Sequence, residues 1–359
     1  MSKGLYIHVP FCRRKCVYCD FYSLSGREGM IDAYVNAVVR NIKAYGGRYD
    51  TVYFGGGTPS LLSAEHIYSI LSSADIEKGA EISAECNPDS VTAEKFSAYR
   101  RAGINRISVG IQSFDDSELD MLGRLHDGQQ AKAALKAAAM AGFENISADL
   151  MLGLPYQKAA TIENNIRSLA ELGVTHISAY MLKIEEGTPL ADDETLSQAA
   201  ADSDAMADHY ENAVSLMEGL GYHQYEISNF APEGYECRHN LKYWRCEDYL
   251  GIGPSAHSCM DGKRFAVPAD IDSFMTAHVM RTEITDDEPC SEEERMMLAL
   301  RLSEGYDFSS CKDASLLLKA AAPMEKHGLL TISGKRIALT SKGFLVSNEI
   351  ICRLAEALI

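Results

Sequence analysis

Short apolar, β-branched runs alternate with amphipathic segments through the first half of the chain. Between the runs, apolar residues recur at helical spacing in residues 31–45, 93–103, 131–142 and 161–173. Three of these segments end in Ala-Gly or Leu-Gly, where a left-handed helix cap is expected. The apolar runs themselves are predicted strands at residues 5–9, 51–54, 81–85, 106–111, 145–151 and 176–182.

Repeated strand–helix units place parallel strands side by side with right-handed crossovers. We therefore predict an α/β fold in which residues 1–220 form a partial (β/α)6 barrel of the TIM type, with its functional face at the carboxyl ends of the strands. A further helix is predicted at about residues 197–219. Residues 221–268 are rich in Gly, Asn and aromatics and have little periodicity, so we interpret them as packed loops within a connecting segment, residues 221–290.

The pattern changes again at residue 291. Ser291 and Glu294 form a candidate capping box, a second helix is predicted at residues 315–327, and two short strands follow around Ser333-Gly334. This order predicts a mostly helical, winged-helix-like domain over residues 291–359. Its acidic surroundings favour a docking or lid role over DNA binding.

The charge balance narrows the classes of partner. The chain has 34 basic and 51 acidic side chains and a formal net charge of -17, which disfavours non-specific nucleic-acid binding. No apolar run is long enough to span a membrane, and the N-terminus lacks the pattern of a secretion signal. We expect a cytoplasmic protein whose ten cysteines stay reduced.

Three of the cysteines, Cys12, Cys16 and Cys19, lie within eight residues. Clustered thiolates favour zinc, copper or an iron–sulfur cluster. A structural zinc site usually takes two close pairs of ligands, whereas here a second pair is absent and His8 is the nearest alternative, so zinc is the runner-up. Three thiolates on a cubane iron–sulfur cluster would leave the fourth iron open to an exchangeable ligand. We expect the seven scattered cysteines to be structural.

Polar residues at the strand ends point to the same face. Glu85 ends the third predicted strand, Gln112 follows the fourth and Asp149 lies in the fifth, so their side chains are expected to converge. A glycine run, residues 55–57, follows the second strand and permits close approach of backbone to a ligand. Each feature has a purely structural alternative, such as a turn or a buried hydrogen-bonded carboxylate.

The spacing Cys12-x3-Cys16-x2-Cys19, with Tyr18 before the last cysteine, resembles the cluster motif of radical S-adenosylmethionine (SAM) proteins. The resemblance implies a [4Fe-4S] cluster whose open iron binds the amino and carboxylate groups of SAM and supplies the electron that cleaves it. The cofactor then carries the difficult chemistry, and the protein orients it and excludes water.

Further segments resemble the oxygen-independent coproporphyrinogen oxidase-like branch, and most closely its heme chaperones. They are YIHVPFC, FGGGTPS, ISAECNP, SVGIQSF, LGRLH, DLMLGLP and HNLKYW, in that order. The resemblance implies that the SAM region is lined by Tyr6, Tyr18, Gly56, Gly57, Thr58, Glu85, Gln112, Arg124, Asp149 and Lys183. The last of these rests on counting from Asp149.

Two departures favour a chaperone over the decarboxylating oxidase. The oxidases carry a further cysteine where this chain has Phe21, and an N-terminal extension that is expected to be absent here. Whether the chain is also an enzyme stays open. A zinc-stabilised regulator with a winged helix is the third hypothesis.

The motif HNLKYW supplies candidate heme contacts. His239 is a candidate axial ligand, Tyr243 and Trp244 can flank a flat macrocycle, and His257 in GIGPSAHS is a rival ligand. The structural alternative is a loop in which His239 bonds to backbone and the aromatic rings fill the core. We expect heme to pass to an acceptor, for example a respiratory protein, with membrane contact only through that acceptor. The sequence leaves both monomer and dimer open.

Overall fold

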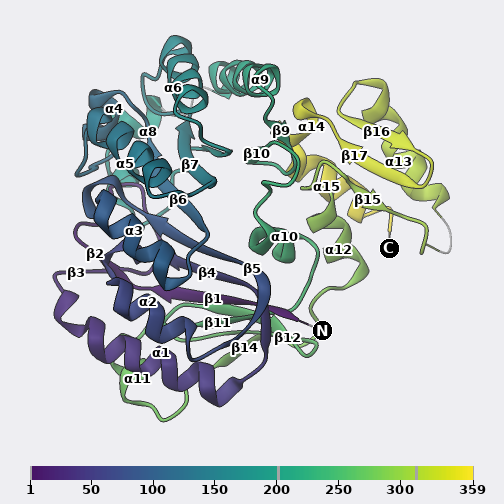
Figure 1. The fold of residues 1–359 in the computed structure, drawn as a ribbon. Helices are drawn as coiled ribbons and strands as arrows, with labels where there is room; N and C mark the ends of the chain where they lie inside the picture. The colour runs from purple at the N-terminus through teal and green to yellow at the C-terminus, as the bar shows by residue number, and fades with distance from the viewer. Residues whose placement is uncertain (1, 200–202, 312–313, 359) are drawn as a thin grey trace.

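The computed structural model describes residues 2–199, 203–311 and 314–358 (Figure 1). The six predicted strands are all present and pair in parallel, in the order in which they occur along the chain. They are β1 (Lys3–Val9), β4 (Arg48–Gly56), β5 (Asp75–Cys86), β6 (Arg106–Gln112), β7 (Asn145–Leu152) and β8 (His176–Met181). Two two-residue strands, β2 (Phe11–Cys12) and β3 (Leu24–Ser25), pair apart from this sheet.

Helices connect successive strands and cover the outer face of the sheet (Figure 1). They are α1 (Ile31–Tyr45), α2 (Ala64–Leu71), α3 (Ala93–Ala102), α4 (Asp116–Met121), α5 (Gly128–Met140) and α6 (Ala159–Glu171), with short 3₁₀ turns at Glu28–Met30, Pro59–Leu61 and Pro88–Ser90. The helices predicted at residues 31–45, 93–103, 131–142 and 161–173 are confirmed to within a few residues. The helix predicted at about residues 197–219 includes residues 200–202, which lie outside the described residues. Gly103 after α3 has φ 117°, which an L side chain rarely adopts, so glycine ends this helix as expected.

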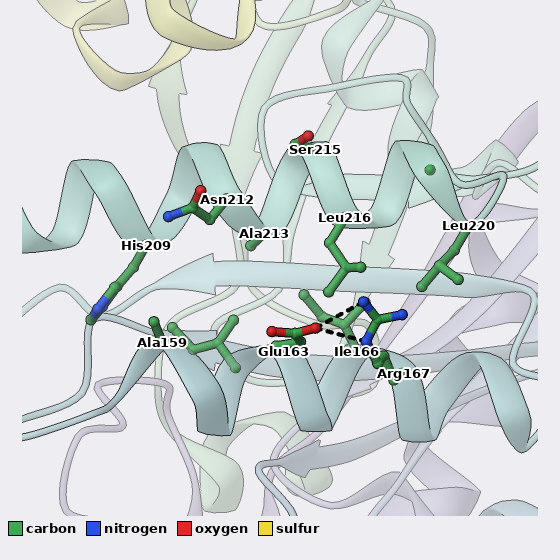
Figure 2. A pocket seen from close by; sticks show the side chains of 12 residues that line it. Ala159, Glu163, Ile166, Arg167, His209, Asn212, Ala213, Ser215, Leu216 and Leu220 are labelled. Atoms are coloured by element: carbon green, nitrogen blue, oxygen red, sulfur yellow. Dashed lines mark hydrogen bonds and ion pairs between the residues drawn. The ribbon is translucent and has the colours of Figure 1, made fainter.

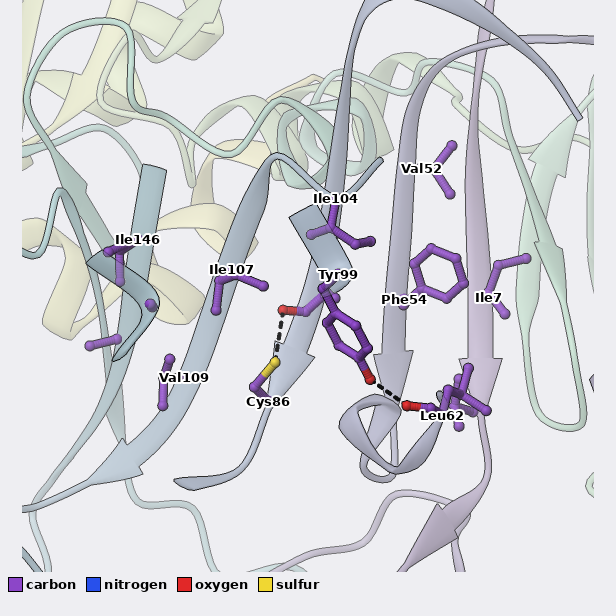
Figure 3. Close-up of a cluster of buried hydrophobic side chains, with 14 of the residues drawn as sticks. Ile7, Val52, Phe54, Leu62, Cys86, Tyr99, Ile104, Ile107, Val109 and Ile146 are labelled. Atoms are coloured by element: carbon purple, nitrogen blue, oxygen red, sulfur yellow. Dashed lines mark hydrogen bonds between the residues drawn. The ribbon is translucent and has the colours of Figure 1, made fainter. Parts of the chain in front are cut away.

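Alternating side chains along the strands separate the two faces of the sheet. Ile7, Val52, Phe54, Ile107 and Ile146 point to the helices and form one buried apolar core (Figure 3). Their neighbours in sequence point the other way and are largely polar, namely Tyr6, Thr51, Tyr53, Ser108 and Ser147. The inner face of the sheet is therefore available for a polar site.

The expectation of packed loops over residues 221–268 is wrong. After α7 (Pro189–Asp192), α8 (Glu194–Ala199) and α9 (Ser203–Gly219), the chain adds β9 (His223–Gln224), β10 (Asn229–Ala231), α10 (Arg238–Trp244), β11 (Tyr249–Ile252), β12 (His257–Met260), β13 (Lys263–Ala266), α11 (Ile271–Thr276) and β14 (Glu283–Asp286). In the described residues these strands complete a twelve-stranded mixed sheet, ordered β14-β13-β12-β11-β1-β4-β5-β6-β7-β8-β10-β9. Strands of two to four residues are too short to show a period in sequence.

The C-terminal part has a second apolar core, which includes Met296, Leu317, Ile337 and Leu354. Its elements are α12 (Glu292–Ala299), β15 (Tyr306–Asp307), α13 (Ser315–Lys326), β16 (Leu330–Ser333), β17 (Arg336–Leu339), α14 (Ser341–Leu345) and α15 (Ser347–Ala355). The three strands form a separate sheet, ordered β15-β17-β16.

The predicted capping box at α12 is only half present. Ser291 Oγ accepts a hydrogen bond from the Glu294 backbone N–H at 3.2 Å. The Glu294 carboxylate accepts instead from the Cys290 N–H at 2.6 Å, one residue before the cap. Ser291 therefore still caps the helix, but the return bond from the Glu294 side chain goes to Cys290 and not to Ser291.

Phe54 tests the dependence of the sheet on its outer core. The side chain is fully buried, so Phe54→Ala is expected to lower the free energy of unfolding by about 3–5 kcal/mol, through lost burial and a residual cavity. Urea unfolding followed by circular dichroism measures the change. The control Tyr68→Ala, at a side chain that is 63% exposed, should shift the same free energy by less than about 0.5 kcal/mol. Equal losses in both variants would contradict this assignment of the core.

Candidate functional site

A cavity of about 520 Å³ opens at the carboxyl ends of the parallel strands, where the sequence predicts the functional face. It brings together the three clustered cysteines and every predicted SAM contact except Tyr6. Its wall contains Cys12, Cys16, Tyr18, Cys19, Gly56, Gly57, Thr58, Glu85, Gln112, Arg124, Asp149 and Lys183. Residues that are far apart in sequence thus meet because parallel strands end at one edge.

Hydrogen bonds from neighbouring side chains hold the cysteine loop. Thr58 Oγ1 donates to Cys12 Sγ at 3.4 Å, and Arg124 Nη1 donates to Cys16 Sγ at 3.4 Å. The Cys19 backbone N–H donates to the Cys16 carbonyl at 3.3 Å. Donors aimed at sulfur stabilise thiolates, which are the forms that bind metal. The three thiols fit a metal cluster as donors, with Arg124 compensating their negative charge.

The glycine run also has a packing role that the sequence did not reveal. A Cβ on Gly57 would lie 2.7 Å from the Phe11 carbonyl oxygen and 3.1 Å from Cys12 Sγ. The Gly57 N–H donates to the Val9 carbonyl at 2.8 Å, which fixes the glycine run against the start of the cysteine loop. Glycine at this position is therefore required by the loop itself, whatever ligand approaches it.

Gln112 has an unusual backbone conformation. Its φ is 64°, and the pairing of β6 with β7 shifts register between Gly110 and Gln112. A positive φ is unfavourable for a residue with a side chain and is retained where surrounding structure enforces it. The shift turns a largely buried amide into the cavity wall.

Two half-buried carboxyl groups, Glu85 and Asp149, line the cavity. Burial, together with the nearby Asp149, raises the pKa of Glu85 to about 7, although Tyr53 donates a hydrogen bond to Glu85 Oε1 at 2.9 Å. Burial also raises the pKa of Asp149, whose Oδ1 accepts from Ser108 Oγ at 3.2 Å. A bound cation would offset the cost of ionising these groups, so the cavity favours a positively charged ligand.

The predicted contact Tyr6 lies outside the wall of this cavity. Its hydroxyl hydrogen-bonds with His8 Nδ1 at 3.0 Å, and His8 Nε2 bonds with the Tyr22 carbonyl at 2.9 Å. The His8 ring is thus held between two oxygens. Tyr6 lies beneath the site on the inner face of the sheet, where its ring stacks on Tyr53.

His239 is fully buried, and both of its ring nitrogens have partners. Nδ1 bonds with Thr51 Oγ1 and Nε2 with the Tyr243 hydroxyl, each at 2.8 Å. Burial, with the charge of Lys242, lowers the pKa of His239 to about 3, so the ring is neutral. An iron ligand at this position would have to break one of these bonds. The structural alternative for this motif is thus correct only in that His239 is hydrogen-bonded within the protein. The partners are side chains and not backbone, and the motif forms a helix and not a loop.

Helix α10, which carries HNLKYW, is fixed to the sheet through its first turn. Glu81 on β5 accepts hydrogen bonds from the backbone N–H groups of Arg238 at 3.1 Å and His239 at 3.0 Å. A carboxylate at a helix N-terminus satisfies N–H groups that lack partners within the helix. No pattern in the sequence indicated that Glu81 would cap a helix more than 150 residues away.

A second cavity, of about 700 Å³, lies between β8, α10 and the C-terminal part. Tyr243 and Trp244 line it, as do Phe344 and Leu345 of α14. Tyr180, Leu182 and Lys183 line both cavities, so the two adjoin. The heme candidate His257 is exposed and is not in the wall of this cavity. It lies near His8, whose pKa is lowered mainly by burial and further by the charge of His257.

A further cavity, of about 570 Å³, lies between α6 and α9 (Figure 2). Glu163 and Arg167 on its wall form an ion pair with each other at 2.8 Å. Its other lining residues include Ile162, Ile166 and Leu216. His209 also lines this cavity, and none of the site residues predicted from the sequence does.

Comparisons with known proteins agree with this geometry. The model of the radical SAM superfamily matches residues 6–169, and that of the HemN C-terminal domain matches residues 292–346. The heme chaperone HemW of Escherichia coli is 42% identical over 265 residues, covering 71% of this chain and 69% of the relative. HemW of Bacillus subtilis is 34% identical over 378 residues, covering 97% of this chain and 98% of the relative. The chain belongs to the HemW family of heme chaperones.

A solved structure of E. coli coproporphyrinogen III oxidase (HemN), a radical SAM enzyme, superposes on this HemW-family chain with a TM-score of 0.82. It covers 99% of this chain and 90% of the oxidase, at 21% identity. That likeness shows the α/β fold with its mixed sheet. In the described residues, no helix has the length and apolar character needed to cross a membrane.

Sequence reasoning missed several residues of the two cavities in this HemW-family chain. Asn87 and Tyr180 line the cysteine cavity, and Glu226 and Arg301 line the second. Tyr180 alternates with buried Ala179 on β8, which is the one signal that could have placed it on the inner face. The scattered cysteines also contain a close pair, with Cys259 Sγ and Cys290 Sγ 3.9 Å apart.

Glu85 provides a pH test of the cavity. Because its folded pKa is about 7, above the usual 4.5, its contribution to stability is fully present below about 4.5 and is lost as the pH rises through about 7. Glu85→Gln should therefore gain about 2 kcal/mol relative to wild type between pH 5 and pH 8, measured by urea unfolding. The control Glu233→Gln, on an exposed loop, should show no such change. A Glu85→Gln difference that is the same at both pH values would rule out the raised pKa.

Proposed function

We propose that this chain is a cytoplasmic heme chaperone that holds a [4Fe-4S] cluster and SAM in the first cavity and heme in the second, and passes heme to an acceptor protein. The observation that carries the proposal is the shared wall of Tyr180, Leu182 and Lys183 between a three-cysteine cavity and a larger aromatic one. The HemW relatives are named heme chaperones, which supports this activity.

In this proposal Cys12, Cys16 and Cys19 hold the cluster, which when bound supplies an open iron and an electron. Arg124 positions the loop, since Nη2 donates to Asn87 Oδ1 at 2.9 Å and to the Gly110 carbonyl at 2.6 Å while Nη1 reaches Cys16. This network ties the loop to the ends of β5 and β6.

Glu85 and Asp149 would attract the positive charge of SAM, and the amide of Gln112 would hydrogen-bond to its ribose hydroxyls or adenine edge. Burial raises the pKa of both carboxyl groups, and a cationic ligand in the cavity would favour their ionised forms. Tyr18 and the glycine run, Gly56 and Gly57, would close the cavity around the ligand. Lys183, 78% exposed and paired with Glu185, lies at the rim between the two cavities.

For heme, Tyr243 and Trp244 would flank the macrocycle in the second cavity, whose other wall belongs to the C-terminal part. We propose that residues 1–220 act as a partial barrel, residues 221–290 as a connecting segment that carries α10, and residues 291–359 as a winged-helix-like domain that covers the heme. Release would then require the last unit to move.

The coproporphyrinogen oxidase activity is the alternative. Phe21 lines the mouth of the first cavity with 62% of its surface exposed, where the oxidases are expected to carry another cysteine. An anaerobic assay with coproporphyrinogen III separates the two functions. Formation of protoporphyrinogen would favour the oxidase, whereas heme binding without that product supports the chaperone.

The cysteine loop gives the first test of the proposal. Anaerobically reconstituted protein should hold about four irons per chain, and Cys19→Ser should lose most of them, because one of three cluster ligands is missing. Metal analysis and the visible absorbance of the cluster measure this. The control Cys352→Ser, at an exposed cysteine, should retain full iron content. Zinc in place of iron in wild type would instead support the zinc regulator.

Heme binding has a built-in reporter, because Trp244 is the single tryptophan of the chain. Hemin bound in the second cavity should quench most of the tryptophan fluorescence at the same concentrations that develop the Soret band. Trp244→Phe keeps an aromatic wall and should retain the Soret change, while Trp244→Ala should weaken hemin binding by about tenfold. A full Soret change without quenching would place heme elsewhere.

Two histidine variants extend the same titration to the iron ligand. His239→Ala should shift the Soret band if His239 leaves its two hydrogen bonds to bind iron, and His257→Ala should shift it if the exposed rival binds. An unchanged spectrum in both variants would exclude both predicted axial ligands.

A further inference from the structure

The second cavity combines an aromatic wall with one cationic side chain, Arg301, for which no ion pair is found among the described residues. Tyr243 and Trp244 come from α10, Phe344 and Leu345 from α14, and Ile227 from the turn before β10. Such walls suit a broad apolar ligand. A tetrapyrrole also carries carboxylates, and these need a cation when they are taken out of water.

The ionisable groups on the cavity wall differ in whether an ion pair or a hydrogen bond within the protein already balances their charge. Lys183 Nζ forms an ion pair with Glu185 at 2.7 Å. Glu226 is 1% exposed and accepts a hydrogen bond from the Ser228 N–H at 3.1 Å. Burial raises the pKa of Glu226 to about 7, while the positive charge of the nearby Arg301 acts in the opposite direction. Below neutral pH Glu226 is therefore largely uncharged, so it competes little for Arg301 and repels a carboxylate little.

Arg301 is the exception. Its Nη2 donates to the amide oxygen of Asn348 at 3.0 Å, which is a neutral partner. Within the described ranges, 2–199, 203–311 and 314–358, no carboxylate lies within ion-pair distance of Arg301. A guanidinium has five N–H donors in a planar fork that matches a carboxylate, so most of its capacity is unused.

The backbone around Arg301 is fixed at the junction of the two parts of the molecule. The Arg301 carbonyl accepts from the Ile227 N–H at 2.9 Å, and the Ser303 N–H donates to the Tyr225 carbonyl at 3.0 Å. A short β-bridge joins Glu226 and Leu302 between them. The C-terminal part therefore holds the cation in the wall of the cavity that Tyr243 and Trp244 of α10 also line.

We infer that Arg301 binds a carboxylate of the tetrapyrrole in the second cavity. The inference rests on the proposed function, because it needs this cavity to hold the porphyrin. It adds a specificity-determining residue, which selects tetrapyrroles with free carboxylates. It also makes the ligand a bridge, stacked on α10 and anchored by charge to the C-terminal part. Loss of that charge pair would loosen both the ligand and the contact between the two parts.

The test compares hemin with hemin dimethyl ester, which has the same ring and iron but no free carboxylates. Wild type should bind hemin about tenfold more tightly than the ester, by Soret titration. Arg301→Gln should weaken hemin binding by about tenfold and leave ester binding unchanged. Arg301→Lys, which keeps the charge without the fork, should recover part of the loss.

The matched control is Arg353→Gln, which removes one positive charge from the same part of the chain. Arg353 is exposed, paired with Glu349 at 2.6 Å and absent from the cavity wall. It should leave both affinities unchanged. Equal thermal unfolding of the variants and wild type checks that Arg301→Gln still folds.

The outcomes separate the two ideas. Suppose that wild type binds hemin and that binding quenches Trp244. If Arg301→Gln then lowers the affinities for hemin and for the ester equally, or lowers neither, the role of Arg301 is overturned and the heme site stands. If wild type binds neither ligand, the proposed function fails and the inference fails with it.

Discussion

Alternation of side chains along the six parallel strands is the constraint on which the rest of the structure depends. The sheet can place Glu85, Ser108 and Asp149 on its inner face because the intervening residues, such as Phe54 and Ile107, bury an apolar core under the helices. The apolar half supplies the stability that offsets the cost of burying carboxyls. A shift of one residue in register would exchange the two faces.

The two cavities use this inner face differently. The first lies where strands end, so backbone turns and short loops can deliver thiols, glycine and an amide to one point. The second needs a wall that the sheet cannot supply, and α10 and the C-terminal part provide it. Glu81 connects the sheet to α10, because its carboxylate accepts hydrogen bonds from the first backbone N–H groups of that helix. Polar side chains on the inner face of the sheet thus line the first cavity and also fix α10, the helix that lines the second cavity.

This arrangement gives a physical reason for the ambiguity of HNLKYW. His239 is most stable as a neutral bridge between Thr51 and Tyr243, deep in the interior. Tyr243 and Trp244, on the same helix, reach the second cavity. In the proposed heme site the motif would contribute its two aromatic residues, while His239 holds Tyr243 through a hydrogen bond that binding of iron would break.

The sequence by itself determined the strand–helix order, the three-cysteine loop and most of the first cavity, because strand alternation and motif spacing are local properties. Parallel strands then bring Cys12, Gly57, Glu85 and Asp149 to one edge without further information. The second cavity was decided by tertiary structure alone. A β-bridge between Glu226 and Leu302 brings Arg301 to the second cavity, and Glu81 caps α10 from far away in sequence. Such contacts leave no periodic trace, so only the folded chain reveals which cation faces the aromatic wall.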